Sequence, residues 1–105
     1  VPGQGNNSYI FPGVGLGVLV SESSRVTDEM FAVAARTLAG MVTSNDLDMG
    51  RLYPSLSRIR EVSREIAIAV AEIAFKRGLA RVERPADLAD AVSDAMYQPY
   101  YTSMV

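Results

Sequence analysis

Few residue types remain in this chain that could carry out chemistry. The 105-residue sequence contains no histidine and no cysteine, which excludes the commonest general base, the commonest transition-metal ligand and every thiol nucleophile. The net charge is −2, so a nucleic-acid or anionic-membrane partner has no electrostatic support. One lysine, Lys76, and nine arginines remain beside the amides, hydroxyls and carboxylates.

Asn6 and Asn7 form the most distinctive polar feature, an adjacent pair of amides in a stretch that carries no charge before Glu22. Glycines precede the pair, so we predict a loop over residues 1–10. An amide donates and accepts hydrogen bonds and does not titrate, so it can hold a hydroxy-carboxylate without repelling it. A helix predicted to begin near Pro12 would direct its positive end toward this loop. The alternative is that both amides only cap turns.

Three glycines follow at positions 13, 15 and 17. Their GxGxG spacing differs from the GxGxxG of dinucleotide-binding loops, and no βαβ unit surrounds it. We predict instead a glycine-rich apolar helix over residues 11–23. In that helix Gly13, Gly17 and Ser21 share one face, where a neighbouring element can pack closely. No cofactor-binding residue is assigned.

The carboxylates have the spacing of surface charges rather than of acid–base or metal groups. Glu72 and Lys76 are spaced for an i, i+4 ion pair on a helix. Asp46 and Asp48 lack the periodic ligands of a calcium loop. No catalytic residue and no metal-binding residue is therefore assigned in this chain.

Helices are predicted to position these residues. Thr27 is suited to an N-cap, with acidic side chains in the first turn after it, and Gly40 is suited to the end of that helix. The longest helix is expected from about residue 57 to 77. It is apolar around much of its circumference, which indicates the centre of a core.

The remaining pattern also favours helices. Gly78 is expected to end the central helix, and a last helix is expected between Pro85 and Pro99. Convincing period-two alternation is absent, apart from a few residues near 79–82. The fold class predicted for residues 1–105 is therefore all-α, with four to five helices.

Length and composition are those of one globular domain, with 49% hydrophobic and 21% charged residues. An uncharged opening of this length is unlike a free, solvated terminus, so we expect the chain to be the C-terminal fragment of a larger protein. The apolar run 9–20 is too short for a membrane span, and a signal peptide's charged n-region is missing. We predict no membrane partner and a cytoplasmic location.

Five segments, in order along nearly the whole chain, resemble the C-terminal part of malic enzymes. They are residues 3–13 (GQGNNSYIFPG), 25–31 (RVTDEMF), 50–57 (GRLYPSLS), 59–63 (IREVS) and 96–100 (MYQPY). The first segment is long and unusual. Two departures concern packing alone: Ser55 stands where many relatives have a second proline, and Tyr97 stands where many have tryptophan.

The resemblance implies a larger α/β, Rossmann-type parent enzyme that oxidises (S)-malate with NAD or NADP, assisted by Mg or Mn. The parent would then decarboxylate the product to pyruvate and CO₂. The resemblance further implies that Asn6 and Asn7 bind the substrate and that the parent is a homo-oligomer. The family's acid–base groups, metal ligands and Rossmann glycines are expected upstream, so we predict an inactive fragment. The alternative is a helical interaction or oligomerisation module without a catalytic role.

Overall fold

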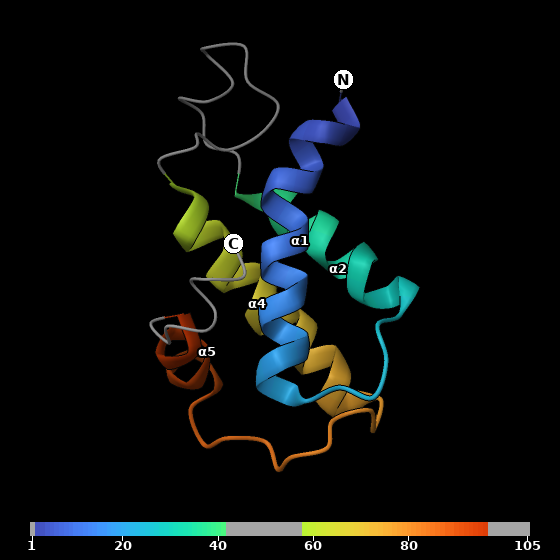
Figure 1. The fold of residues 1–105 in the computed structure, drawn as a ribbon, viewed down its shortest axis with the longest axis vertical. Helices are drawn as coiled ribbons and strands as arrows, with labels where there is room; N and C mark the ends of the chain where they lie inside the picture. Colours follow the sequence, from blue (N-terminus) through green and yellow to red (C-terminus); the bar gives the residue numbers. More distant parts are fainter. Residues whose placement is uncertain (1, 42–57, 97–105) are drawn as a thin grey trace.

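The computed structural model describes residues 2–41 and 58–96, with side chains from residue 10 onward. This part of the chain forms four helices: α1 (Pro2–Ser21), α2 (Asp28–Gly40), α4 (Ile59–Lys76) and α5 (Leu88–Met96) (Figure 1). The two described ranges contain no strand, which confirms the all-α prediction for them. The single turn expected near residues 44–50 and the tail 97–105 lie outside the described residues.

Helix α1 begins much earlier than the sequence predicts. The expected loop over residues 1–10 is wrong from Pro2 onward, because the helix starts there and continues through Pro12. Proline is well tolerated at a helix start, whereas an interior proline removes one backbone hydrogen bond and costs about 3 kcal/mol. Packing along the rest of α1 outweighs that cost. The expected helix N-terminus near Pro12, with its positive end, is therefore wrong as well.

The end of α1 is defined by a left-handed residue. Glu22 has a φ of 50°, and the Ser23 backbone N–H donates to the carbonyl of Val18 over 3.2 Å. This is the usual way in which a helix closes its last turn. The buried Ser21 hydroxyl donates to the carbonyl of Gly17 over 2.8 Å, so this hydroxyl has a hydrogen-bond partner inside the core.

Two glycines allow α1 to lie directly against α4. A Cβ atom at Gly13 would lie 2.5 Å from Cγ2 of Ile66, and one at Gly17 would lie 2.8 Å from the Ala67 carbonyl oxygen and from Cβ of Val70. The same four-residue step occurs on both helices, so α1 and α4 run in the same direction where they cross, and Figure 1 shows their N-terminal ends apart. The predicted close packing of the glycine face is confirmed, and its partner is α4 of the same chain.

Helix α4 is the centre of the core and contacts α1, α2 and α5. One buried cluster joins α4 to α1 and α2, and a second joins α4 to α1 and α5. The first comprises Val14, Met30, Ala34, Leu38, Val62, Ile66, Val70, Ile73 and Ala74. The second comprises Leu16, Ala67, Ala71, Leu88, Val92 and Met96. The prediction of a central apolar helix is confirmed, with bounds within two residues of those expected.

Caps set the bounds of the flanking elements. The Thr27 hydroxyl accepts a hydrogen bond of 3.2 Å from the Met30 backbone N–H, which confirms the predicted cap of α2. Gly78 has a φ of 70°, a conformation that glycine adopts without strain, and it follows Arg77, the C-cap of α4. A carboxyl oxygen of Asp87 accepts from the Asp90 backbone N–H over 3.0 Å at the start of α5. Within the described ranges no helix is both long and apolar enough to span a bilayer.

Candidate functional site

The register of α1 against α4 locates the asparagine pair. Gly13 faces Ile66 and Gly17 faces Val70, and this register can be continued about two turns toward the N-termini. It then places Asn6 and Asn7 level with Ile59, where α4 begins. The pair therefore lies at the upper end of the bundle in Figure 1.

The helical backbone changes what the pair can offer to a ligand. In a helix that begins at Pro2, the unbonded N–H groups belong to the first turn, so Asn6 and Asn7 offer their side-chain amides and not their backbone amides. Successive helical residues occupy positions about 100° apart around the axis. The side chains of both residues lie outside the described part of the chain.

Arg58 lies at this end of the bundle. It occupies the N-cap position of α4. Its guanidinium donates to the Met41 carbonyl over 2.7 Å and to the Glu61 carboxylate over 2.8 Å. It thereby joins the C-terminus of α2 to the N-terminus of α4. The start of α4 favours an anion, as any helix N-terminus does, and Glu61 already stands in its first turn.

The described residues show neither a phosphate-binding loop nor a cluster of metal ligands. The glycines at 13 and 17 lie inside α1 and pack on α4, so they are not a phosphate-binding loop. Over residues 2–41 and 58–96 no group of three or more acidic side chains could hold a metal ion. Neither nicotinamide nor divalent-cation chemistry can be derived from this part of the chain.

Two carboxylates at the other end of the molecule are held ionised by arginines. The Arg77 guanidinium donates two hydrogen bonds of 2.8 Å to the two oxygens of Glu29, and these bonds lower the pKa of Glu29. The pair connects the end of α4 to the start of α2. Carboxylates with a lowered pKa stay charged at neutral pH and are poor general acids.

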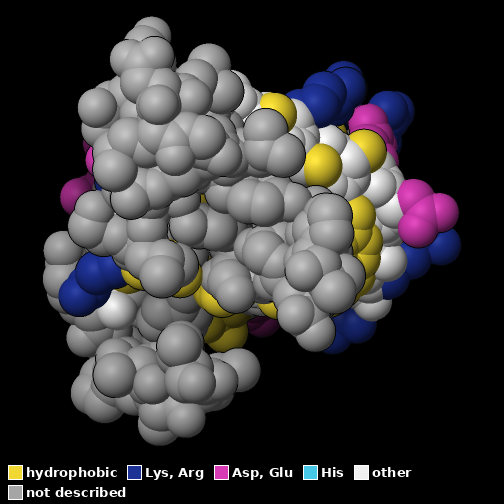
Figure 2. All heavy atoms as spheres, turned by 90° about the horizontal axis from the view of Figure 1, so that it is seen from above, with side chains coloured by type: hydrophobic (Ala, Val, Ile, Leu, Met, Phe, Trp, Pro, Cys, Tyr) yellow, Lys and Arg dark blue, Asp and Glu magenta, His cyan; other side chains and the backbone are white. Residues whose placement is uncertain are grey.

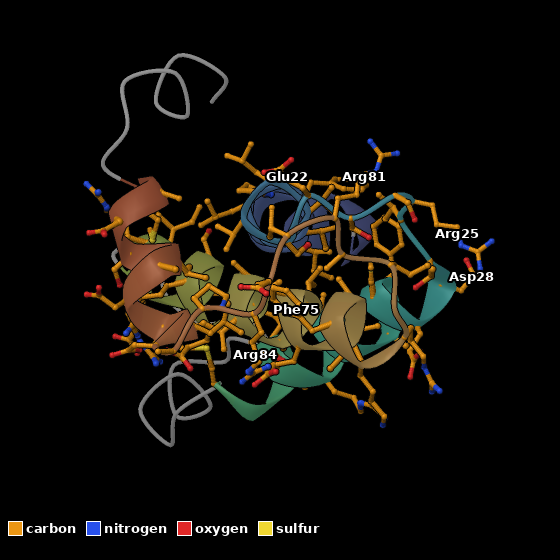
Figure 3. The ribbon with its side chains drawn as sticks, turned by 90° about the horizontal axis from the view of Figure 1, so that it is seen from below. Glu22, Arg25, Asp28, Phe75, Arg81 and Arg84 are labelled. Carbon is orange, nitrogen blue, oxygen red and sulfur yellow. The ribbon has the colours of Figure 1, made fainter. Side chains whose placement is uncertain are left out.

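The ion pair expected between Glu72 and Lys76 is wrong, because Glu72 pairs with Arg84 instead. Both guanidinium nitrogens of Arg84 donate to the Glu72 carboxylate, which lowers the pKa of Glu72. The guanidinium carbon also lies 5.9 Å from the centroid of the Phe75 ring (Figure 3). A planar guanidinium can bind both oxygens and stack on a ring, which an ammonium cannot do.

These two pairs predict a loss of stability in acid. The pKa of Glu29 and of Glu72 lies below the ordinary 4.5 in the folded chain. The stabilisation that these two ion pairs give to the folded chain is therefore complete above about pH 4.5. It is lost as the pH falls through the lower pKa values that the two carboxyls have in the folded chain. Urea unfolding midpoints between about pH 7 and about pH 3 measure this. The unfolding midpoint of the double variant Glu29→Gln/Glu72→Gln should depend less steeply on pH. An unchanged pH dependence of the midpoint would contradict the assignment of the acid effect to these two ion pairs.

The comparisons with known proteins identify the family of this chain. Residues 1–75 match the family model described as "Malic enzyme, NAD binding domain". The NADP-dependent malic enzyme of Dictyostelium discoideum is 46% identical over 101 residues, which is 96% of this chain and 19% of that relative. The NADP-dependent malic enzyme of Vitis vinifera is 46% identical over 104 residues, 98% of this chain and 18% of the relative.

A third relative is named as dependent on NAD rather than on NADP. The mitochondrial NAD-dependent malic enzyme of Ascaris suum is 41% identical over 105 residues, 99% of this chain and 16% of that protein. This chain belongs to the malic enzyme family. It spans 16–19% of the length of these three relatives. Because NAD- and NADP-dependent relatives both match, the chain does not distinguish the two cofactors.

Proposed function

We propose that this chain is part of a malic enzyme that oxidises (S)-malate with NAD or NADP and decarboxylates the product to pyruvate and CO₂. The family match over residues 1–75, together with identities of 41–46% over at least 96% of the chain, carries this proposal. In the proposed whole enzyme, a Rossmann-type region binds the nicotinamide and Mg or Mn assists the reaction. Homo-oligomeric assembly and a cytoplasmic location stay predictions.

The part played by this chain is to bind and orient the substrate. Asn6 and Asn7 would donate amide N–H groups to malate oxygens, and their amide carbonyls would accept from the malate hydroxyl. Their position level with the start of α4 supports this role, because a helix N-terminus favours a dicarboxylate. Uncharged amides add no electrostatic repulsion to the substrate. Held against α4, α1 presents them on a rigid element, which favours precise orientation.

The chemistry itself would be supplied from outside this chain. The described residues contain neither a dinucleotide loop nor a cluster of metal ligands. We therefore expect the isolated chain to show no malate-dependent reduction of NAD or NADP. Turnover by the isolated chain would overturn the proposal that the catalytic groups lie outside this chain.

A chimera tests the role of the asparagines. The matching segment of the Vitis vinifera enzyme is replaced by this chain, and malate-dependent NADP reduction is measured. Asn7→Ala should lower kcat/KM for malate by about 10- to 100-fold, because one or two hydrogen bonds worth ~1–3 kcal/mol are lost. Asn6→Ala should have an effect of the same kind.

The control is a described, exposed residue beyond the other end of α4. Glu83→Ala should leave the malate kinetics within about twofold. Unchanged kinetics for both Asn6→Ala and Asn7→Ala in an active chimera would remove the pair from the pocket. A folded but inactive chimera would favour the alternative, an interaction module without a catalytic role.

A further inference from the structure

Gly13 sets how closely α1 approaches α4 on the side of the asparagine pair. A Cβ atom at this position would lie 2.5 Å from Cγ2 of Ile66, 2.6 Å from Cβ of Ile66 and 3.1 Å from the Ser63 carbonyl oxygen. Ile66 is fully buried and Ser63 is 4% exposed, so neither residue can give way toward solvent. The backbone of α1 can therefore keep its present distance from α4 only while residue 13 has no side chain.

The helix itself connects this contact to the asparagine pair. Helix α1 continues through Pro12 without a break, so the contact and the pair belong to one element. With a rise of 1.5 Å per residue, Asn6 lies about 10 Å from Gly13 and about 16 Å from Gly17, the next point of contact with α4. Figure 1 shows that the two helices separate toward their N-termini, so the first turns of α1 project beyond the crossing.

A side chain at position 13 would tilt these first turns. Carbon atoms in contact are about 3.5–4.0 Å apart, so a methyl group 2.5 Å from Ile66 would need about 1 Å more room. With α1 pivoting about Gly17, which is about 6 Å away, a shift of about 1 Å at position 13 becomes about 3 Å at Asn6. Misplacement by about 1 Å can lower the rate of a reaction about 100-fold.

The other described contacts of this half of α1 give way more easily. Ile10 is only partly buried against the α2–α4 cluster. The Phe11 ring lies edge-on to the Phe31 ring of α2, with centroids 6.0 Å apart, but the two side chains are 54% and 38% exposed. Figure 2 views this end of the molecule, where hydrophobic side chains of the described residues reach the surface beside charged ones. These side chains can follow a displacement of α1, whereas the glycine contact cannot absorb one.

We propose that Gly13 is a positioning residue for the malate site, because its missing side chain sets the distance of α1 from α4 and thereby the place of Asn6 and Asn7. This inference rests on the proposed function, since it takes the asparagine pair as the group that binds malate. Gly13 touches no substrate and acts through the helix that carries the amides. Gly15 has no such role, because a Cβ atom there would meet nothing within 4 Å.

The kinetics of Gly13→Ala in the chimera with the Vitis vinifera enzyme test the proposal. Misplaced amides should raise the KM for malate and lower kcat/KM for malate at least about tenfold, with the KM for NADP within about twofold. A residue that matters only for folding would lower the amount of active enzyme. That loss lowers the apparent kcat and leaves the KM for malate unchanged, so the KM for malate separates positioning from stability.

Two control variants are matched to Gly13→Ala. Gly15→Ala makes the same chemical change on the open side of α1. Leu16→Ala destabilises the chain by removing a fully buried side chain from the α4–α5 cluster, without pushing α1 away from α4. Both controls should leave the KM for malate within about twofold.

An unchanged KM for malate in an active Gly13→Ala chimera would overturn the proposal, as would an equal rise in Leu16→Ala. If Gly13→Ala leaves no active enzyme, the double variant Gly13→Ala/Ile66→Ala is compared with Ile66→Ala alone. Cβ of residue 66 remains 2.6 Å from the new methyl group, so the double variant should still raise the KM for malate. Equal KM values for these two variants would reject the positioning role.

The outcome is separable from that of the proposed function. A loss of malate kcat/KM in Asn7→Ala without a rise of KM in Gly13→Ala rejects the positioning role and leaves the proposed function intact. If the chimera itself does not fold, the same substitutions are made at the aligned positions of the Vitis vinifera enzyme, and the same comparison of KM values decides.

Discussion

Gly17→Ala should lower the free energy of unfolding of this chain by about 1–2 kcal/mol. The new Cβ atom would lie 2.8 Å from the Ala67 carbonyl oxygen and 2.8 Å from Cβ of Val70. The first of these atoms belongs to the backbone, so a change of rotamer cannot relieve the clash and the helices must separate. Overpacking of this kind typically costs 1–3 kcal/mol and occasionally more, and better helix propensity returns only about 1 kcal/mol.

The matched control variant changes a glycine that lies one half-turn away on the same helix. Gly15→Ala makes the same change where nothing lies within 4 Å, so it should raise stability by up to about 1 kcal/mol. Urea unfolding followed by far-UV circular dichroism compares the two variants directly. Equal effects of Gly15→Ala and Gly17→Ala would contradict the placement of α1 against α4.

These glycines show which parts of the fold the sequence predicts well. The i, i+4, i+8 face of Gly13, Gly17 and Ser21 predicted close packing, and α4 supplies it. The cap at Thr27 and the stop at Gly78 were also predicted correctly. All of these signals are local: a short polar side chain, a missing Cβ atom or a helical spacing determines the result within one or two turns.

The first ten residues could not be predicted in this way. Asparagine and glycine each disfavour a helix, and Pro12 indicates a helix start rather than a helix interior. The apolar spacing that favours α1 begins only at Ile10, which packs against the α2–α4 cluster. Tertiary packing from there onward overrides the local preferences, and packing partners far along the chain are invisible in one sequence.

The candidate site shows the same division. The amide chemistry of Asn6 and Asn7 predicts a site for a hydroxy-acid, and the resemblance predicts the substrate class; both stay predictions. The helix N-terminus predicted near Pro12 is wrong, because α1 already begins at Pro2. The sequence also failed to predict the partner of Glu72, because Arg84 lies beyond the end of the helix that contains Glu72.

Leu16→Ala should lower the free energy of unfolding by about 3 kcal/mol and loosen α5 before the rest of the molecule. The Leu16 side chain is fully buried between α4 and α5, in the cluster that also contains Leu88 and Val92. Truncation of a buried leucine costs 2–5 kcal/mol, because it leaves a cavity. Helix α5 has only nine residues, too few to be stable without tertiary contacts.

Hydrogen exchange separates this local effect from a global one. In Leu16→Ala the backbone amides of α5 should lose protection more than those of α2, which belongs to the other cluster. Phe11→Ala removes a larger side chain that is 54% exposed, so it should cost less than about 1 kcal/mol and leave α5 protected. Uniform loss of protection in α2 and α5 would instead mean that the two clusters unfold as one unit.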